Sequence, residues 1–355
     1  MSNCGTQLTL IIDIGSGTQD VLFYETGKEI ENCFKMVLPS PTQEKAKKIR
    51  EITQKRAPLF LTGRVMGGGA CVAAIKNHLK SGLEVFATKS AAKTINDNMD
   101  HVKALGIKLV EKPPKDMVPV ELEDVNIDQW RRFCELWSIR LPDQYAVAVQ
   151  DHGESMELSN RHFRMMRWRA FMDSGGRFED LIYRQPPVDL TRMKSVRESL
   201  NQNVILMDTG AAAICGALED PALAALKEKG LVIVNLGNSH TLIALVLGGK
   251  VTGLCEHHTS MLTPSKLSHL IDRIVTGSLT HQEVYDDGGH GVALAKKFSG
   301  MGLSPMTAVT GPKRSLSESL HFYKAVPHGD MMLSGCFGLL RAGRQIGFIS
   351  HNLKG

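Results

Sequence analysis

The sequence predicts an α/β protein made of two related halves, and three observations support this. Short apolar runs alternate along the chain with helical patterns, which is typical of sheets flanked by helices. A strand–turn–strand unit near the start recurs in the second half with the same order of residue types. The 355 residues suffice for two domains. The 43% apolar and 22% charged residues are ordinary for a globular protein and exclude a disordered chain.

The first half begins with a β-hairpin. Residues 8–13 (LTLIID) form an apolar strand that ends in a carboxylate, and residues 21–24 form the next strand after a Gly-Ser-Gly-Thr turn. Because a tight turn joins two strands here, the glycines do not belong to a strand–loop–helix nucleotide fingerprint. Residues 34–38 are the expected third strand of a meander, and a charged helix follows over 42–56.

The rest of the first half, predicted over residues 1–203, continues the alternation of strands and helices. A strand at 59–62 precedes a helix that starts on three glycines, which either bind an anion or form a permissive turn. The buried strand 145–150 runs into Asp151-His152-Gly153-Glu154. Since α/β proteins place chemistry at the carboxyl ends of strands, we interpret this cluster as a substrate or partner site; a structural role is the alternative.

A basic helical insert is expected near residues 155–200. Arg161, Arg164 and Arg167 recur every three residues and therefore share one face of a helix. The simplest interpretation is a solvated basic face over an apolar one. The alternative is that segment 161–169 contacts phosphates or an acidic protein partner.

The second half, predicted over residues 204–355, repeats the opening hairpin. IIDIGSGTQDVLF, which begins at residue 11, and IVNLGNSHTLIAL, which begins at residue 233, align without gaps. Glu256-His257-His258 follows a strand, but adjacent histidines point apart, so a metal site there is the weaker interpretation. The last helix, about 331–350, is expected to pack back toward the first half.

The repeated turn is the feature that points to chemistry. It exposes backbone N–H groups and a hydroxyl beside a polar strand end, which is Asp13 in the first copy and Asn235 in the second. Such groups hold polyphosphate oxygens, and a carboxylate holds Mg²⁺ directly or through water. We therefore expect the two turns to hold polyphosphate oxygens together with Mg²⁺.

On these motifs the chain resembles the actin-like ATPase superfamily, which includes sugar and acetate kinases, heat-shock chaperone ATPases and actin. The resemblance implies two ribonuclease-H-like halves with a nucleotide cleft between them, and five motifs in fixed order. The two phosphate loops correspond to 13–20 and 235–241, the connecting motifs to 208–213 and 329–336, and the adenosine-binding turn to 309–312.

More narrowly, the chain resembles a bacterial and archaeal family described as pyruvate formate-lyase activating enzyme-like. A true activating enzyme needs a three-cysteine iron–sulfur loop. No two of the seven cysteines here have the spacing of a CxxC pair, so that activity is not expected.

The resemblance implies ATP and Mg²⁺ as cofactors and assigns roles to individual residues. Asp13 and Asp208 are expected to hold Mg²⁺, partly through water. Asp208 and Asp13 are candidate catalytic residues, and Asp208 either positions the nucleophile or simply caps a helix. Asp151 is a third candidate, on the basis of its place after a buried strand and not of the resemblance. The expected nucleotide-binding residues are Gly15, Ser16, Gly17, Thr18, Gln19, Asn235, Gly237, Asn238, Ser239, His240, Thr241 and Gly311.

Two functions remain open at this point. The first is a Mg²⁺-dependent ATPase or phosphotransferase. The second is a nucleotide-dependent protein-binding module with little turnover, which Asn235 favours because it lacks the family's carboxylate. The net charge of +5 gives no strong nucleic-acid signal, no apolar run is long enough to cross a membrane, and a cytoplasmic protein is expected.

Overall fold

The computed structural model describes residues 7–155, 157–200, 203–302 and 305–350. The first sheet has the strand order β3-β2-β1-β8-β9. Its first three strands form an antiparallel meander, and β8 and β9 continue the sheet in parallel on the other side of β1. These strands are β1 (Leu8–Ile14), β2 (Thr18–Glu25), β3 (Phe34–Pro39), β8 (Gln144–Val149) and β9 (Val204–Met207).

The second sheet repeats this order with one added strand. In the order β13-β12-β11-β10-β14-β15, the central β10 pairs antiparallel with β11 and parallel with β14, just as β1 pairs with β2 and β8. The predicted α/β fold with two related halves is therefore confirmed. The strands are β10 (Leu231–Leu236), β11 (His240–Leu247), β12 (Lys250–His258), β13 (Gly291–Leu294), β14 (Met306–Thr310) and β15 (Tyr323–Lys324).

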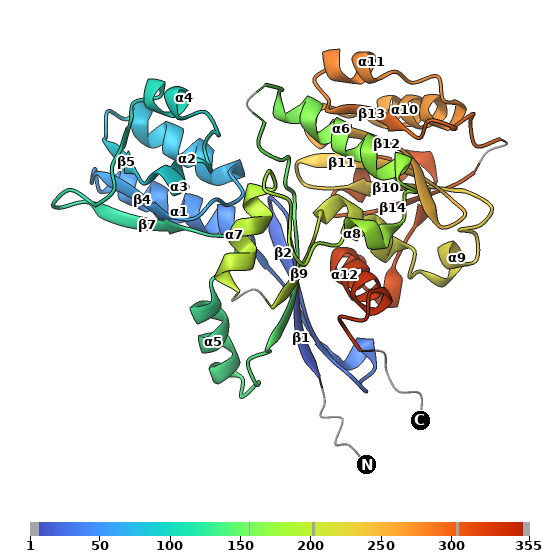
Figure 1. The fold of residues 1–355 in the computed structure, drawn as a ribbon, viewed down its shortest axis with the longest axis horizontal. Helices are drawn as coiled ribbons and strands as arrows, with labels where there is room; N and C mark the ends of the chain where they lie inside the picture. Colours follow the sequence, from blue (N-terminus) through green and yellow to red (C-terminus); the bar gives the residue numbers. More distant parts are fainter. Residues whose placement is uncertain (1–6, 156, 201–202, 303–304, 351–355) are drawn as a thin grey trace.

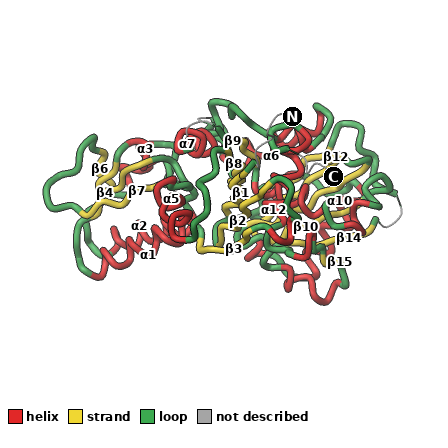
Figure 2. The backbone as a smooth tube through the Cα atoms, turned by 90° about the horizontal axis from the view of Figure 1, so that it is seen from below, coloured by secondary structure: helices red, strands yellow, loops and turns green. Residues whose placement is uncertain are grey.

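A third, wholly parallel sheet lies between β3 and β8 in the chain and forms a separate lobe (Figures 1 and 2). It has its own apolar core, to which its strands and helices both contribute. Its elements are α1 (Pro41–Gln54), β4 (Leu59–Gly63), α2 (Gly69–Lys80), β5 (Val85–Ala87), α3 (Lys89–Ala92), α4 (Met99–Ala104), β6 (Ile107–Leu109) and β7 (Val118–Leu122).

The boundary between the halves differs from the prediction. The strand at 204–207 was assigned to the second half, but β9 is an edge strand of the first sheet because it pairs with β8. Its sequence resembles an opening strand, and only pairing distinguishes the two cases. The remaining helices are α5 (Ile127–Leu136), α6 (Asn160–Asp173), α7 (Thr191–Ser199), α8 (Thr209–Ala217), α9 (Pro221–Ala224), α10 (Pro264–Thr276), α11 (His281–Asp286) and α12 (Ser334–Gln345).

Helices α8 and α12 each follow the last strand of a sheet and pack against each other (Figure 1). Glycines permit their close approach. A Cβ on Gly216 of α8 would collide with the carbonyl oxygen of Ser334, and one on Gly338 of α12 would collide with that of Ala212. Helix α12 also contacts β1 and β8 of the first sheet. Among the described residues, no helix is long and apolar enough to span a membrane.

Candidate functional site

The turns of the two repeated hairpins meet tip to tip. Ser16 Oγ lies 2.6 Å from Ser239 Oγ, and Gly17 lies so close to the Asn238 side chain that a Cβ on residue 17 would force that side chain to move. Each turn is closed by the same backbone hydrogen bond: Gly15 N donates to Thr18 O (2.9 Å), and Gly237 N donates to His240 O (3.0 Å). The sequence repeat therefore produces the same turn twice, and the two copies face each other.

Two carboxylates lie behind the first turn. Asp13 and Asp20 are opposite each other in the hairpin register, and both are buried. Thr209 Oγ1 donates to Asp13 Oδ1 (2.6 Å), and the start of α12 lies so close that a Cβ on Gly335 would collide with Asp13. Asp13 thus lies at the first residues of both α8 and α12.

Burial raises the pKa of Asp13 to about 7, and the nearby charge of Asp208 adds to this. Burial, together with the charge of Asp13, raises the pKa of Asp20 to about 8. Within the described part of the chain, Asp20 Oδ1 has no hydrogen-bond partner. Buried oxygens of this kind fit a hard divalent cation such as Mg²⁺, because a cation would compensate both the charge and the missing partner.

A small cavity of about 70 Å³ continues from these carboxylates toward Gly311. Gly311 has a positive φ of 98°, and it lies against Leu236 O and Asn235 Oδ1, so only glycine fits. The turn at residues 309–312 is therefore in contact with the start of the second hairpin turn. The other lining residues from the predicted set are Gly15, Ser16, Thr18, Gly237 and Asn238.

Asp208 is engaged on both oxygens. It caps α8 by accepting from Gly210 N (3.0 Å), and it forms a bidentate ion pair with Arg164, whose Nη1 and Nη2 lie 2.8 and 3.2 Å from its two oxygens. Arg164 Nε also donates to Glu256 Oε2 (2.6 Å). Arg164 is only 4% exposed and Glu256 only 1%. The arginine charge holds the pKa of Glu256 well below its usual range despite burial, which raises it.

The prediction of a solvated basic face on α6 is wrong, because the arginines of that face bond to other parts of the protein. Arg161 Nη1 donates to Gly289 O (2.7 Å), Arg164 is buried as described, and Arg167 pairs with Asp189. The helix face that carries these three arginines is directed into the molecule, because carboxylates and carbonyl groups of distant segments accept their hydrogen bonds. Arg169 and Met166, on the other side of α6, are exposed.

Asp151 also uses both oxygens locally. It accepts from Gly153 N (2.9 Å) and Met193 N (2.9 Å), so it joins the end of β8 to α7. Burial raises its pKa, and the two backbone donors oppose that rise. Two other predicted residues face away from the tips. Gln19 Nε2 donates to Pro39 O (3.1 Å), and the Thr241 hydroxyl bonds with that of Thr259 (3.0 Å) in the interior.

A larger cavity of about 330 Å³ opens on the other side of the tips, between the hairpins and the third-sheet lobe. The glycine run of the lobe lines it, and Gly67 N donates to Asp124 Oδ1 (3.2 Å). Arg192 holds Asp124 with two hydrogen bonds of 2.7 and 2.8 Å. Gly67 packs directly on Arg192, so the glycine permits a close approach of the backbone.

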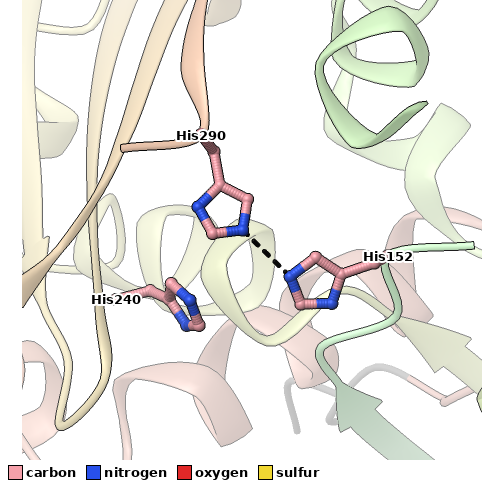
Figure 3. Close-up of side chains that lie close together, drawn as sticks. All are labelled: His152, His240 and His290. Atoms are coloured by element: carbon pink, nitrogen blue, oxygen red, sulfur yellow. Dashed lines mark hydrogen bonds between the residues drawn. The ribbon is translucent and has the colours of Figure 1, made fainter. Parts of the chain in front are cut away.

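Three residues of this region were missed from the sequence. Asp20 could have been found, because a hairpin with this turn places it opposite Asp13. Arg164 was noted only as part of a basic face. His290 gave no local signal; it lies beside His152 and His240 only after the second sheet has formed (Figure 3).

Two sheets with the same strand order, meeting at paired hairpin turns, define the actin-like class of ATPase folds. Within that class, residues 66–316 match the model of the family described as "Putative pyruvate format-lyase activating enzyme (DUF1786)". The chain belongs to this family. No curated protein matches it.

Solved structures give distant likenesses. The ethanolamine utilization protein EutJ from Carboxydothermus hydrogenoformans shares 10% identity at a TM-score of 0.34, over 94% of this chain and 88% of that one. The PilM-PilN type IV pilus biogenesis complex shares 10% identity at a TM-score of 0.36, over 94% of this chain and 98% of that one. A ROK family transcriptional regulator, a homologue of E. coli MLC, shares 9% identity at a TM-score of 0.28, over 71% of this chain. This chain spans only 39% of that regulator. The fold assignment therefore rests on the sheet order of the molecule itself.

Proposed function

We propose that this chain binds a magnesium nucleotide between its two hairpin turns and transfers the terminal phosphate to water or a small acceptor. The observation that carries the proposal is the meeting of the turns, with Ser16 and Ser239 hydroxyls 2.6 Å apart. Both turns present hydroxyls and backbone N–H groups to one point. Such groups are suited to oxygens of a polyphosphate.

In this proposal nucleotide binding breaks the direct contact between Ser16 and Ser239. Phosphate oxygens would take the place of the partner serine, so the tips must separate before binding. Helices α8 and α12 are the elements that join the halves behind the tips. The glycine at residue 311 leaves room beside the second turn for the nucleoside.

Asp13 and Asp20 would hold the magnesium ion on the side of the first turn. When bound, Mg²⁺ neutralises the charge on the phosphates and orients them for transfer. Asn235 offers a neutral amide on the opposite side and so contributes polar contacts but no charge. The cavity of about 330 Å³ beyond the tips has the size for a small acceptor.

The alternative is a nucleotide-dependent binding module with little turnover. The observation that favours it is the state of Asp208 and Asp151. Both carboxylates accept hydrogen bonds on both oxygens from groups of the protein itself, which gives each of them a structural role in the fold. In this case ATP would open the tips, and a partner protein would bind the altered halves.

Nucleotide binding and turnover on the purified full chain separate these functions. We expect ATP with Mg²⁺ to raise the melting temperature, and ATP to be consumed by the wild type but not by Asp13→Ala. Binding without turnover would select the binding module. If ATP and ADP, each with Mg²⁺, give no stabilisation, both functions are excluded. Equal turnover in both proteins would exclude the phosphotransfer function.

A further inference from the structure

Three histidines from distant parts of the chain converge beside the large cavity. His152 follows β8 of the first sheet, His240 begins β11, and His290 precedes β13. One ring nitrogen from each lies within 4.8 Å of the other two. Figure 3 shows the three rings around one common space, with His152 and His290 directed at each other.

The closest pair has the separation expected for ligands of one ion. His152 Nε2 and His290 Nε2 are 3.0 Å apart. Two nitrogens bound to a tetrahedral Zn²⁺ at the usual bond length of about 2.0–2.1 Å are separated by about 3.3 Å. His240 completes the group, with its ring centroid 4.8 Å from that of His290 and 5.9 Å from that of His152.

The rings are held as neutral imidazoles, which is the form that binds metal. Burial lowers the pKa of His290 to about 3 and that of His240 to about 4, and it lowers the pKa of His152 well below its usual range. His290 is 2% exposed, and its Nδ1 has no hydrogen-bond partner among the described residues. A buried orphan nitrogen is costly in a purely structural cluster.

The surrounding charges favour a cation. Asp208 and Glu256 carry two negative charges against the single positive charge of Arg164, and all three are buried. Glu256 acts to raise the pKa of each of the three histidines, and Arg164 acts to lower it. The three histidines therefore lie beside a buried group of charged side chains whose sum is negative.

We propose that His152, His240 and His290 form a binding site for a divalent transition-metal ion, Zn²⁺ in the simplest case. Imidazole ligands suit Zn²⁺, Fe²⁺, Ni²⁺ and Cu²⁺ rather than Mg²⁺, so this site is chemically distinct from the carboxylates behind the first turn. Three protein ligands leave a coordination position for water or a substrate atom, as in catalytic zinc sites.

The position of the site gives it a role in the cleft. His152 and His240 line the large cavity, so the open position would be accessible from it. His152 belongs to the first half, whereas His240 and His290 belong to the second. A bound ion would therefore join the halves.

Metal titration of the full chain without a polyhistidine tag tests this site. After chelator treatment and its removal, we expect one equivalent of Zn²⁺ per chain by calorimetry. Co²⁺ should bind in the same place with visible d–d absorption and be displaced by Zn²⁺. His290→Ala and His240→Ala should each weaken Zn²⁺ binding by at least about 100-fold.

Two controls keep the result decisive. His162→Ala removes a histidine whose ring lies 4.9 Å from that of His281, a neighbouring pair outside the cluster, and it should bind Zn²⁺ like the wild type. His240 is only half-buried, so His240→Ala carries the test if His290→Ala does not fold. The proposal is overturned if the wild type binds no stoichiometric Zn²⁺, if folded His240→Ala binds it unchanged, or if His162→Ala loses it.

Discussion

The two hairpin turns share a backbone but differ in charge. In the first hairpin, the residues that face each other just behind the turn are Asp13 and Asp20. In the second hairpin the same register positions hold Asn235 and Leu242. The turns themselves close with the same hydrogen bond and meet at their tips. The fold thus repeats its geometry, while the acidic groups occur on one side only.

This difference separates two requirements that a nucleotide would impose. Holding phosphate oxygens needs donors from both sides, and both turns supply them. Holding a metal ion needs negative oxygens, and only the first hairpin supplies a buried pair of them. The two halves are alike, by contrast, where helices α8 and α12 cross. Each helix contributes one glycine to that crossing, Gly216 from α8 and Gly338 from α12.

The largest effect is expected where the halves are equivalent. Gly338→Ala and Gly216→Ala should each destabilise the chain by about 3 kcal/mol, because the added methyl collides with backbone of the other helix. Thermal unfolding of both variants measures this. If one variant is as stable as the wild type, the helices do not cross as described, and the equivalence of the halves at this crossing fails.

Making the first hairpin resemble the second should abolish metal-dependent binding. Asp13→Asn is expected to weaken ATP binding in Mg²⁺ by about 100-fold, which corresponds to about 2.7 kcal/mol. Binding in EDTA should not weaken, because the substitution removes a negative charge that would repel the phosphates. Calorimetry with and without Mg²⁺ gives both values, and Asp143→Asn, a change at an exposed position, is the control. A loss of equal size in EDTA would show that Asp13 acts on the fold and not on the metal.

Asp20→Asn should stabilise the chain without metal. A folded-state pKa of about 8 lies above the ordinary value of 3.8, so the folded state binds more protons between these values. Asp20 therefore contributes stability that is present at low pH and is lost as pH rises from about 4 to about 8. In EDTA at pH 8.5, Asp20→Asn should melt about 2 °C higher or more, and it should lose the stabilisation by Mg²⁺. A lower melting temperature would show that the Asp20 charge is compensated within the protein.

The smallest expected effect is that of Asn235→Asp, which gives the second hairpin the missing carboxylate. A second acidic oxygen near the ion should tighten ATP binding in Mg²⁺ by roughly 3- to 10-fold. Without metal, repulsion from the phosphates should weaken binding. If the substitution changes the affinity for ATP equally with Mg²⁺ and in EDTA, residue 235 does not lie near the metal.

Local sequence patterns predicted the hairpins and the sheet strands, since apolar alternation and turn residues act over a few positions. The repeat predicted two related halves for the same reason. The assignment of β9 failed, because a short apolar strand does not encode its partner. The prediction that Arg164 is solvated was also wrong, because it forms ion pairs with Asp208 and Glu256, which come from segments far along the chain.

Parts of the candidate site could not be predicted from the sequence, because they depend on contacts between residues far apart in the chain. The tip-to-tip contact joins residues 16 and 239, and the histidine cluster joins 152, 240 and 290. Neither is visible until both sheets are assembled. Asp20 is the exception, because its place opposite Asp13 follows from the length of the turn alone.

The meeting of the tips provides the most direct test of the account. Ser16→Cys combined with Ser239→Cys should form a disulfide on mild oxidation, because the hydroxyl oxygens they replace are 2.6 Å apart. The six native cysteines in the described residues are buried and should not compete, and the two single variants serve as controls. If nucleotide binds between the turns, the oxidised double variant should not bind ATP, and reduction should restore binding. ATP binding by the oxidised form with wild-type affinity would contradict the account.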